Sequence, residues 1–485
     1  MRSAKLIVLA GLAAAFGCEG EPLDARTQVV ASVLSRADEP LLRSRPGFVE
    51  AKYAAMRASP FAFVRGSLPI HRHDWATGEI ASSRFTVSLP LVRGLGDPHP
   101  ENFGLLAAAD GTLALEPNDF DAADRVPYLW DVRRLAASLA VAVSLSNADD
   151  AAARQRAVAA RPEVVRRFAA SYAQSLAAIA RGEPGARAIA GRGGPVVDDL
   201  FRRGARDLAA RAELSGLTEI TAGARRLRRG VVDPEEPTAR LDDAPEVVRA
   251  ALPRALEVYR ETLVAPVDAG ELAVLDVARQ LGSGVASRPR VRFLVLVRGP
   301  TDAPEDDVVL EVKELVDSGT ATPLPLPVHA GSVEERVLDA SRAAWARPDA
   351  ERWWGASRLL GLPVQVRLES EAQKSVRVAR LVGARGTPEA LSSLADVLGA
   401  LLARVHAVPV PRESDPAVVV SGAIGADVAA FAEEQAAFAE GYAARSLGDA
   451  ARFAAALDAL GPRLGVPIDP IDAPRADTRA LWGTP

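Results

Sequence analysis

The sequence predicts a mixed α+β protein with a helix-rich large lobe and a small antiparallel β lobe. Apolar residues recur at helical spacing over 129–145, 162–180, 391–406 and 428–460. Two β-rich runs, 291–297 and 308–315, flank an acidic turn, which is the pattern of an antiparallel hairpin. With 485 residues and 48% hydrophobic residues, the chain is long enough for a catalytic unit of two lobes.

The N-terminus has the pattern of an export signal. Arg2 and Lys5 precede an apolar run over 6–16, which is too short to span a bilayer. The run leads into Cys18, the only cysteine, and resembles the lipid-attachment site of bacterial lipoproteins. We therefore expect an exported protein held at the membrane only through a lipid on Cys18. An ordinary signal or a buried first helix are the alternatives, and without a signal the protein would be cytoplasmic.

Changes in composition and hydrophobic pattern along the chain suggest how its domains are organised. A helix over 46–58 is followed by two short β-like runs, 61–64 and 85–89. The boundaries that we expect are a signal over 1–18, a tether over 19–45, a helical lobe over 46–270, a β lobe over 271–330 and a helical continuation over 331–485. The net charge of −5 and the pI near 5.8 give no electrostatic footprint for nucleic acid.

Two acidic loops carry the strongest chemical signal, Gly96-Asp97-Pro98-His99-Pro100-Glu101-Asn102 and Asn118-Asp119-Phe120-Asp121. Phosphoryl transfer assisted by Mg²⁺ needs a carboxylate that accepts the proton of the attacking hydroxyl. It also needs hard oxygen ligands for the metal. Asp97, Asn102 and Asp119 have the corresponding residue types and order.

These loops resemble the kinase superfamily, particularly its aminoglycoside-phosphotransferase and choline-kinase-like branch. The match is residue by residue, except that Leu95 replaces the first histidine of that branch's loop. The resemblance implies a catalytic base at Asp97 and metal ligands at Asn102 and Asp119. It also implies supporting roles for three further residues of these segments: His99, Asp121 and Asp131, the last opening a helix that pins the catalytic loop.

A broader resemblance covers about residues 45–450. The segments SPFAFVRG (59–66), GDPHPENFG (96–104), the run from Asn118 to Leu139, VLEVKE (309–314) and RVHA (404–407) resemble the bacterial domain-of-unknown-function family 2252. That family has no established activity to carry over, so the functional expectation comes from the kinase-like loops.

The parts that would bind ATP lie later in the chain. Gly282-Ser283-Gly284 precedes the strand 291–297, and Lys313 lies in the next β-rich run. A glycine turn and a strand lysine are the types that hold nucleotide phosphates, although each alone is more often structural. The lysine follows Asp97 by about two hundred residues, whereas in ordinary kinases it comes first. We therefore expect a circularly permuted kinase-like fold; absence of the nucleotide lobe is the alternative.

Several basic residues each allow two interpretations of their role. Arg65 could bind a phosphate or pair with an Asp of the catalytic loop. His71 and His73 could bind a metal but fit a surface segment better. His406, late in an apolar helix, is expected to be a hydrogen-bonded core residue.

The resulting functional expectation is an ATP- and Mg²⁺-dependent phosphotransferase that acts on an unidentified hydroxyl acceptor. A catalytically silent nucleotide- or ligand-binding module is the alternative, and export favours it because the extracytoplasmic space offers little ATP. A metal-dependent phosphoesterase ranks third, because the chain has only five histidines and lacks the Asn-His and Asp-x-His clusters of such enzymes.

Overall fold

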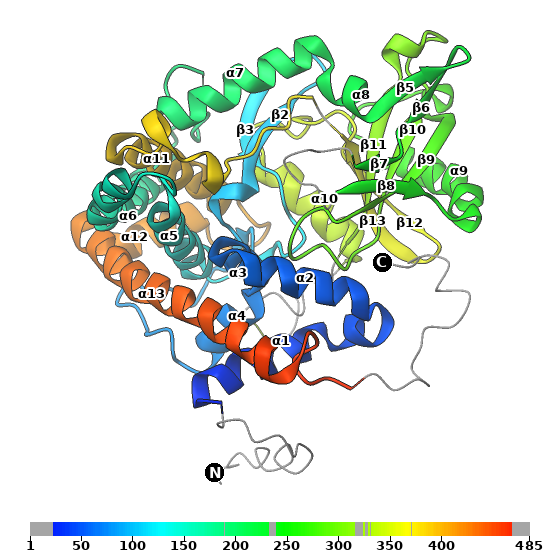
Figure 1. Ribbon diagram of the computed structural model, residues 1–485. Coiled ribbons are helices and arrows are strands. Elements are labelled where there is room, and N and C mark those ends of the chain that lie inside the picture. The colour runs from blue at the N-terminus through cyan, green and yellow to red at the C-terminus, as the bar shows by residue number, and fades with distance from the viewer. Residues whose placement is uncertain are drawn as a thin grey trace.

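The α+β class is confirmed by a computed structural model, in which an antiparallel sheet lies beside a stack of helices (Figure 1). The structure describes residues 23–188, 190–231, 239–315, 324, 328–329, 331–369 and 371–467. The expected signal over 1–18, with Cys18, lies outside the described residues.

The sheet has seven antiparallel strands in the order β12-β13-β11-β10-β9-β8-β7. It is wider than the expected 271–330, because β8 pairs with β9 on one side and β13 pairs with β11 on the other. Helix α10 (Val333–Ala344) lies between β11 and β12 in the sequence. The strands span Gly230–Val231 (β7), Arg240–Asp243 (β8), Val274–Leu281 (β9), Arg292–Val297 (β10), Val308–Glu314 (β11), Gly355–Leu359 (β12) and Leu362–Leu368 (β13).

The two faces of the sheet have different chemistry. One face carries Phe293, Val295, Leu310 and Val312, which pack in one apolar cluster with residues of helix α9 (Glu246–Glu261). Since side chains alternate along a strand, Glu311 and Lys313 lie on the opposite face. That second face is the one turned toward the helical part.

The helical part is built around α5 (Tyr128–Leu145), which packs against α6 (Ala151–Ala180) and α13 (Val428–Leu460). Every residue of α5 from 128 to 143 is buried, so this helix forms the centre of the largest apolar cluster. Helices α11 (Pro388–His406) and α12 (Pro416–Ile424) pack against α6.

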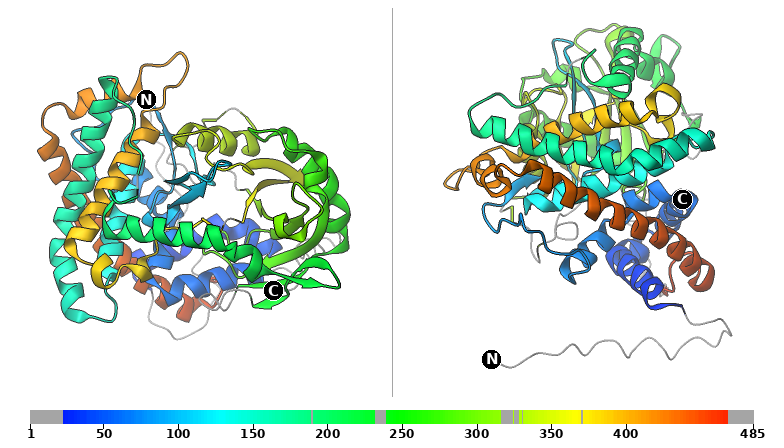
Figure 2. Two further views of the ribbon diagram at one scale, coloured as in Figure 1. Left: turned by 90° about the horizontal axis from the view of Figure 1, so that it is seen from above. Right: turned by 90° about the vertical axis from the view of Figure 1, so that its left-hand side faces the viewer.

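The hairpin of β2 (Phe103–Ala107) and β3 (Leu113–Pro117) lies between the helices and the sheet (Figure 2). The hairpin contacts α7 (Gly194–Ala210), which α8 (Ala212–Leu217) follows in the chain. Two further short antiparallel pairs are β1 (Val92–Gly94) with β4 (Asp124–Val126) and β5 (Thr218–Thr221) with β6 (Ala224–Leu227), and β6 contacts β9 of the large sheet.

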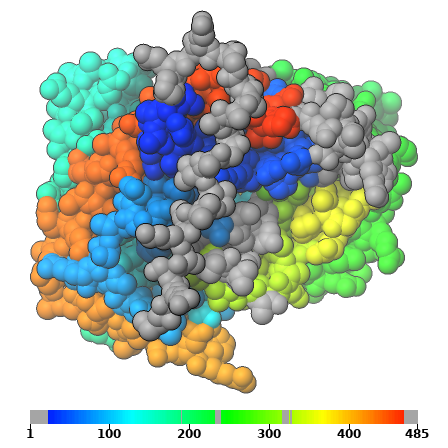
Figure 3. Space-filling model, turned by 90° about the horizontal axis from the view of Figure 1, so that it is seen from below, coloured from blue at the N-terminus to red at the C-terminus, as the bar shows by residue number. Residues whose placement is uncertain are grey.

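The expected tether is wrong for residues 25–44, which form helix α1 (Ala25–Ser44). Asp24 caps this helix by accepting hydrogen bonds from the next backbone N–H groups. Val30, Leu34 and Leu42 are fully buried in one cluster with Phe453 of α13. Figure 3 shows α1, in blue, beside the red end of α13. The apolar stripe of this helix is interrupted by charges, so the sequence predicts only a short helical stretch within a tether, whereas the helix runs through Ala25–Ser44.

The β-like runs at 61–64 and 85–89 are also wrong. Residues 61–64 lie in helix α3 (Pro60–Gly66), because Ser59 caps the chain and Pro60 occupies the first turn. These two residues override the β preference of Phe and Val. Residues 85–89 form no strand. The neighbouring helices are α2 (Pro46–Ala58) and α4 (Leu68–Ala76).

Over the described ranges, no single helix is long and apolar enough to cross a membrane, although the bent pair α12 and α13 passes that criterion jointly.

The packing of α1 leads to a prediction about stability. Leu34→Ala should lower the free energy of unfolding by about 2–5 kcal/mol, because it opens a cavity among fully buried side chains. Urea unfolding measures the loss. The matched control is Val418→Ala at a half-exposed position of α12, which should change stability little. Equal stability of both variants would mean that α1 does not belong to the folded core.

Candidate functional site

The first acidic loop, residues 96–102, is held by a buried carboxylate. Asp131, in the first turn of α5, is fully buried and accepts hydrogen bonds from the backbone N–H groups of Leu95, at 2.6 Å, and Gly96, at 3.0 Å. Trp130 donates its indole N–H to the carbonyl of Gly96 at 2.6 Å. Helix α5 therefore fixes the backbone immediately before Asp97.

Gly96 is required where the two acidic loops meet. It has a positive φ of 78°, and a Cβ at this position would lie 1.9 Å from the carbonyl oxygen of Ala122. Only glycine allows both the conformation and the close approach. The loops are also joined through Asn102, whose carbonyl accepts the N–H of Asn118 at 3.0 Å. The two acidic loops, which are separate in the sequence, therefore lie together in one compact unit.

Asp97 lies in this unit beside an arginine that the sequence reasoning missed. Arg134 donates from Nε to Asp97 Oδ1 at 2.8 Å and from its Nη2 to the carbonyl of Val64 at 2.6 Å. Burial raises the pKa of Asp97, and Arg134 opposes that rise. Arg134 stands three residues after Asp131, hence on the same face of α5, and this spacing was the available signal.

The metal-ligand candidates lie on the same side. Asn102 donates its side-chain amide to the carbonyl of Asp97 at 3.0 Å, which leaves its oxygen available as a ligand. The Asp119 side chain is 40% exposed. Lys313 reaches both carboxylates of the second loop, at 2.7 Å from Asp121 and 3.7 Å from Asp119. Although burial raises the pKa of both acids, Lys313 brings the pKa of Asp119 below its ordinary value, while that of Asp121 stays raised.

The donor set fits Mg²⁺ by chemistry. A carboxylate and an amide oxygen are hard ligands, and Mg²⁺ takes few protein ligands when it also binds phosphates. Among the described residues, no group of three or more His, Cys, Asp or Glu side chains is spaced to hold a metal by itself. The site would therefore need oxygens from a substrate or water to complete a coordination shell.

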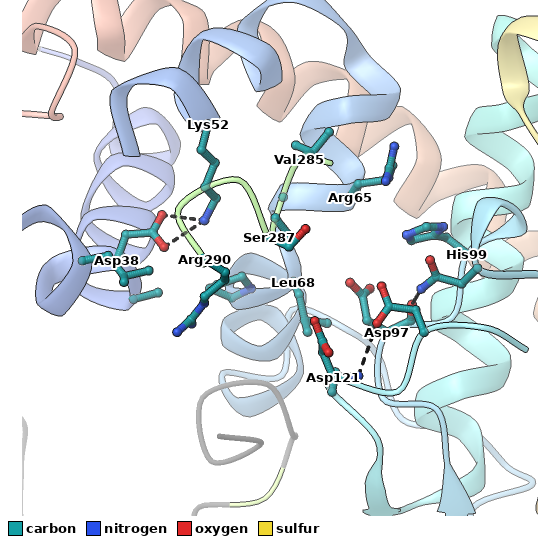
Figure 4. A pocket seen from close by; sticks show the side chains of 18 of the residues that line it. Asp38, Lys52, Arg65, Leu68, Asp97, His99, Asp121, Val285, Ser287 and Arg290 are labelled. Carbon is teal, nitrogen blue, oxygen red and sulfur yellow. Dashed lines mark hydrogen bonds and ion pairs between the residues drawn. The ribbon is translucent and has the colours of Figure 1, made fainter. Parts of the chain in front are cut away.

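A cavity of about 150 Å³ opens in front of these loops. Asp97, Asn102, Asp119 and Asp121 all line it, so the predicted acidic and amide residues share one cleft. Lys313 does not line this cavity and meets it only through its contacts with Asp119 and Asp121. Figure 4 shows Asp97, Asp121 and His99 at one end and the Lys52–Asp38 pair at the other, with Leu68, Ser287 and Arg290 between them.

Two supporting candidates from the sequence also line the cavity. Arg65 pairs with Glu101 of the first acidic loop at 2.9 Å, so the expected pairing with an Asp of that loop is wrong. His99 is 3% exposed and its ring packs edge-on against Phe61. Burial lowers the pKa of His99 well below its usual range, so the ring is neutral. Over the described chain, its Nδ1 has no hydrogen-bond partner.

The glycine turn lies beside the cavity, and the residues after it form the wall. Gly282 and Gly284 have positive φ angles of 77° and 75°. Val285, Ala286, Ser287 and Arg290 line the cavity, but Gly282, Ser283 and Gly284 do not. Arg292 of β10 holds the turn in place by donating hydrogen bonds to Ser283 Oγ at 2.9 Å and to Ser287 Oγ at 3.1 Å.

An ionic ladder runs across the sheet face next to Lys313. Glu311 is 2% exposed and pairs with Arg292 of β10 at 3.2 Å and with Arg367 of β13 at 2.5 Å. Arg367 also donates to the carbonyl of Asn118 at 3.4 Å, beside Asp119. The two arginines lower the pKa of Glu311 to about 2 against the effect of burial. The sequence reasoning missed this ladder, because it depends on the register of the hairpin β10–β11 and on β13, which comes much later in the chain.

The far wall of the cavity was also missed. Lys52 of α2 donates to both carboxylate oxygens of Asp38 of α1, at 2.8 and 2.6 Å, and both side chains are buried. Only the packing of α1 against α2 brings them to the cavity, and no motif marks either residue.

Of the remaining histidines, the surface reading of His71 is wrong. His71 is 1% exposed and its ring packs against Trp130 and Tyr442. His73 is half-buried. The core reading of His406 is confirmed, because it is fully buried and bonds to Tyr172 and Asp131.

The carboxyl of Glu351, next to the ladder, gives a pH-dependent stability. It is 4% exposed and accepts the N–H of Leu368 at 2.7 Å, and burial raises its pKa to about 7. The folded state therefore keeps a proton that the unfolded state loses above about pH 4.5. Stability should fall as pH rises from about 4.5 to about 7, by at most about 1.4 kcal/mol for each unit of the pKa difference.

Glu351→Gln should make this fall smaller by the share of Glu351, because an amide does not titrate, whereas Glu369, whose pKa burial raises to about 8, keeps its own share. Chemical unfolding at a series of pH values tests it, with the exposed Glu257→Gln as control, which should keep the wild-type slope. A Glu351→Gln variant whose slope equals that of the wild type would show that this carboxyl is ionised in the folded protein.

Comparison with known proteins gives one match. The family model described as "Uncharacterized protein conserved in bacteria (DUF2252)" matches residues 44–456. No curated protein and no solved structure matches the chain.

Proposed function

This chain belongs to the bacterial family DUF2252, and from the geometry of its cleft we propose that it is a Mg²⁺-dependent phosphotransferase of kinase-like design. One observation carries the proposal: Lys313 from the sheet reaches the acidic loop beside Asp97. A cleft that holds a phosphate chain among carboxylates needs a cation on its facing wall, and a lysine supplies a mobile one. The donor is a phosphate chain, with ATP as the first candidate, and the acceptor is an alcohol.

The roles of the residues follow from their positions. Asp97 accepts the proton of the acceptor hydroxyl, and its partly buried carboxylate is held in orientation by Arg134. Asn102 and Asp119 would hold Mg²⁺, which neutralises phosphate charge when it is bound. Lys313 exchanges its pairing with Asp121 for a phosphate oxygen. Asp131 positions the loop and does not touch the substrate.

The order of the elements supports a permuted kinase-like fold. In protein kinases a glycine-rich loop covers the phosphates and the lysine lies on the third strand. Here β9, the glycine turn, β10 and β11 follow one another, and Lys313 lies on the third of these strands. The acidic loops precede this unit in the chain instead of following it.

A catalytically silent binding module is the second candidate. The pair between Lys313 and Asp121, at 2.7 Å, balances one carboxylate of the acidic loop from within the chain. A site whose charge is partly balanced without a metal could bind a ligand without turning it over. A metal-dependent phosphoesterase stays third.

Binding of ATP tests the proposal. ATP with Mg²⁺ should raise the melting temperature, because a ligand that binds only the folded state stabilises it. Lys313→Met should weaken binding by roughly 1.5–3 kcal/mol, the contribution of one charge-assisted contact. The control is Lys374→Met, since Lys374 pairs with Asp207 and Glu213 instead. If Mg²⁺ with ATP stabilises neither the wild type nor the control, the phosphotransferase proposal is wrong.

Lipid attachment is a separate proposal. We expect Cys18→Ser to move the protein from the membrane fraction to the soluble fraction, because the lipid on this residue is the proposed anchor. Fractionation of cells that express the full chain measures the change. A wild-type protein that is wholly soluble and keeps residues 1–17 would contradict the signal.

A further inference from the structure

The end of the cavity that lies away from the acidic loops is formed by a buried ion pair (Figure 4). Lys52 of α2 donates to both carboxylate oxygens of Asp38 of α1, at 2.8 and 2.6 Å, and each residue is 5% exposed. A buried ion pair adds little net stability, because the lost hydration of both charges offsets their attraction. The packing of α1 on α2 therefore gains little from this pair, whereas a ligand in the cavity would meet two fixed polar groups.

The ion pair keeps hydrogen-bonding capacity that it does not use internally. An ammonium group has three N–H donors, and a carboxylate has about four acceptor sites. The two hydrogen bonds between Lys52 and Asp38 therefore leave a donor on the ammonium group and at least one acceptor site on the carboxylate. A hydroxyl group both donates and accepts. Two neighbouring hydroxyl groups thus match this pair, one accepting from Lys52 and the other donating to Asp38.

The charges around the cavity are balanced by ion pairs within the protein. Each charged residue of the lining has an oppositely charged partner at 3.7 Å or closer. These pairs are Lys52–Asp38, Arg65–Glu101, Arg134–Asp97, Arg290–Glu314 and Lys313 with both Asp119 and Asp121. Because two carboxylates share Lys313, the remaining negative charge lies where Mg²⁺ is proposed. Away from that point, the described lining offers a charged ligand no unpaired countercharge, which favours a neutral ligand.

The rest of the lining favours a small ligand that has C–H groups of its own. It includes four apolar side chains, those of Leu41, Leu68, Pro69 and Val285. Apolar walls contact the carbon skeleton of a ligand, and a few polar groups fix its orientation. The cavity volume of about 150 Å³ is below the roughly 300 Å³ at which pockets for drug-sized ligands begin. A single ring or a short chain that carries hydroxyl groups meets these conditions.

We infer that the Lys52–Asp38 pair binds two neighbouring hydroxyl groups of the acceptor, so that the acceptor is a small neutral polyol, a class that includes cyclitols and single sugars. The inference that this polyol is the acceptor rests on the proposed phosphotransferase function, because the proposed base, Asp97, lines the same cavity. In the step, the oxygen of a further hydroxyl group bonds to the terminal phosphorus of ATP, and the bridging P–O bond breaks. The hydroxyl proton passes to Asp97, and the electron pair of the broken bond leaves on ADP.

Binding of small polyols to the full chain tests the inference without a measurement of activity. The probes are myo-inositol, D-glucose and glycerol, titrated in the presence of Mg²⁺ and followed by ligand-observed NMR. At least one should bind with a Kd below about 10 mM. Cyclohexanol should bind on the order of tenfold more weakly than the tightest of them, because one hydroxyl group cannot bond to both members of the pair. Absence of binding by all three polyols, or equal binding of cyclohexanol, overturns the inference.

Matched sugars test the preference for a neutral ligand. D-glucosamine carries a positive charge and D-glucuronate a negative one on nearly the same ring as D-glucose. Neither should bind more tightly than D-glucose, because the charged residues of the lining are already paired. Tighter binding of either charged sugar overturns the inference.

Two double variants separate polyol binding from helix packing. Asp38→Leu combined with Lys52→Met replaces the ion pair by apolar side chains of similar size, which tends to preserve stability. Binding of the tightest polyol should weaken by on the order of tenfold or more. The matched control is Glu39→Leu combined with Arg43→Met, which removes a half-exposed ion pair from the same helix and should leave polyol binding unchanged. Equal polyol binding by the two double variants overturns the inference, and the comparison with cyclohexanol needs only the wild type.

The inference and the proposed function fail separately. If ATP with Mg²⁺ stabilises the wild type but none of the polyols binds, the inference is wrong and the phosphotransferase proposal stands. If a polyol binds through Asp38 and Lys52 but ATP with Mg²⁺ does not stabilise the protein, the phosphotransferase proposal is wrong. The polyol site then belongs to a binding module.

Discussion

The site depends on the buried carboxylate of Asp131. A charge with no solvent exposure is stable only when hydrogen bonds replace water, and here two backbone N–H groups and the His406 ring supply them. The same bonds fix the loop that presents Asp97. The hydrogen bonds that compensate the burial of Asp131 therefore also orient Asp97, the candidate base.

A second constraint acts across the cleft. The acidic loops come from the helical part and Lys313 comes from the sheet, so their ion pairs join the two parts of the molecule. Arg367 adds a bond from the sheet to Asn118. Because these contacts use the groups that would bind metal and phosphate, a ligand must compete with them. A ligand bound in the cleft would therefore replace contacts by which the sheet packs against the helical part.

The sequence predicted those features that depend on short spacing. Asp97, Asn102 and Asp119 lie within one stretch whose turns are set locally, and a β-rich run places Lys313 on a strand. Arg134 was within reach of the same reasoning, three residues after Asp131. The ladder of Arg292, Glu311 and Arg367 was not, since its pairing depends on the register of three strands. The cavity wall formed by α1 needed the tertiary packing of a helix with a weak apolar stripe.

The contact between α1 and α13 bears on the order of the elements along the chain. These helices are the first and the last that the structure describes, and they share one apolar cluster. Loop-closure entropy changes only slowly with length, so a short link between two neighbouring ends costs little. A chain relinked here and opened at an exposed turn would keep these packing contacts. The stability of this architecture therefore sets only a weak constraint on which element comes first in the chain. The order of the elements along the sequence can change between related proteins while the cleft stays the same.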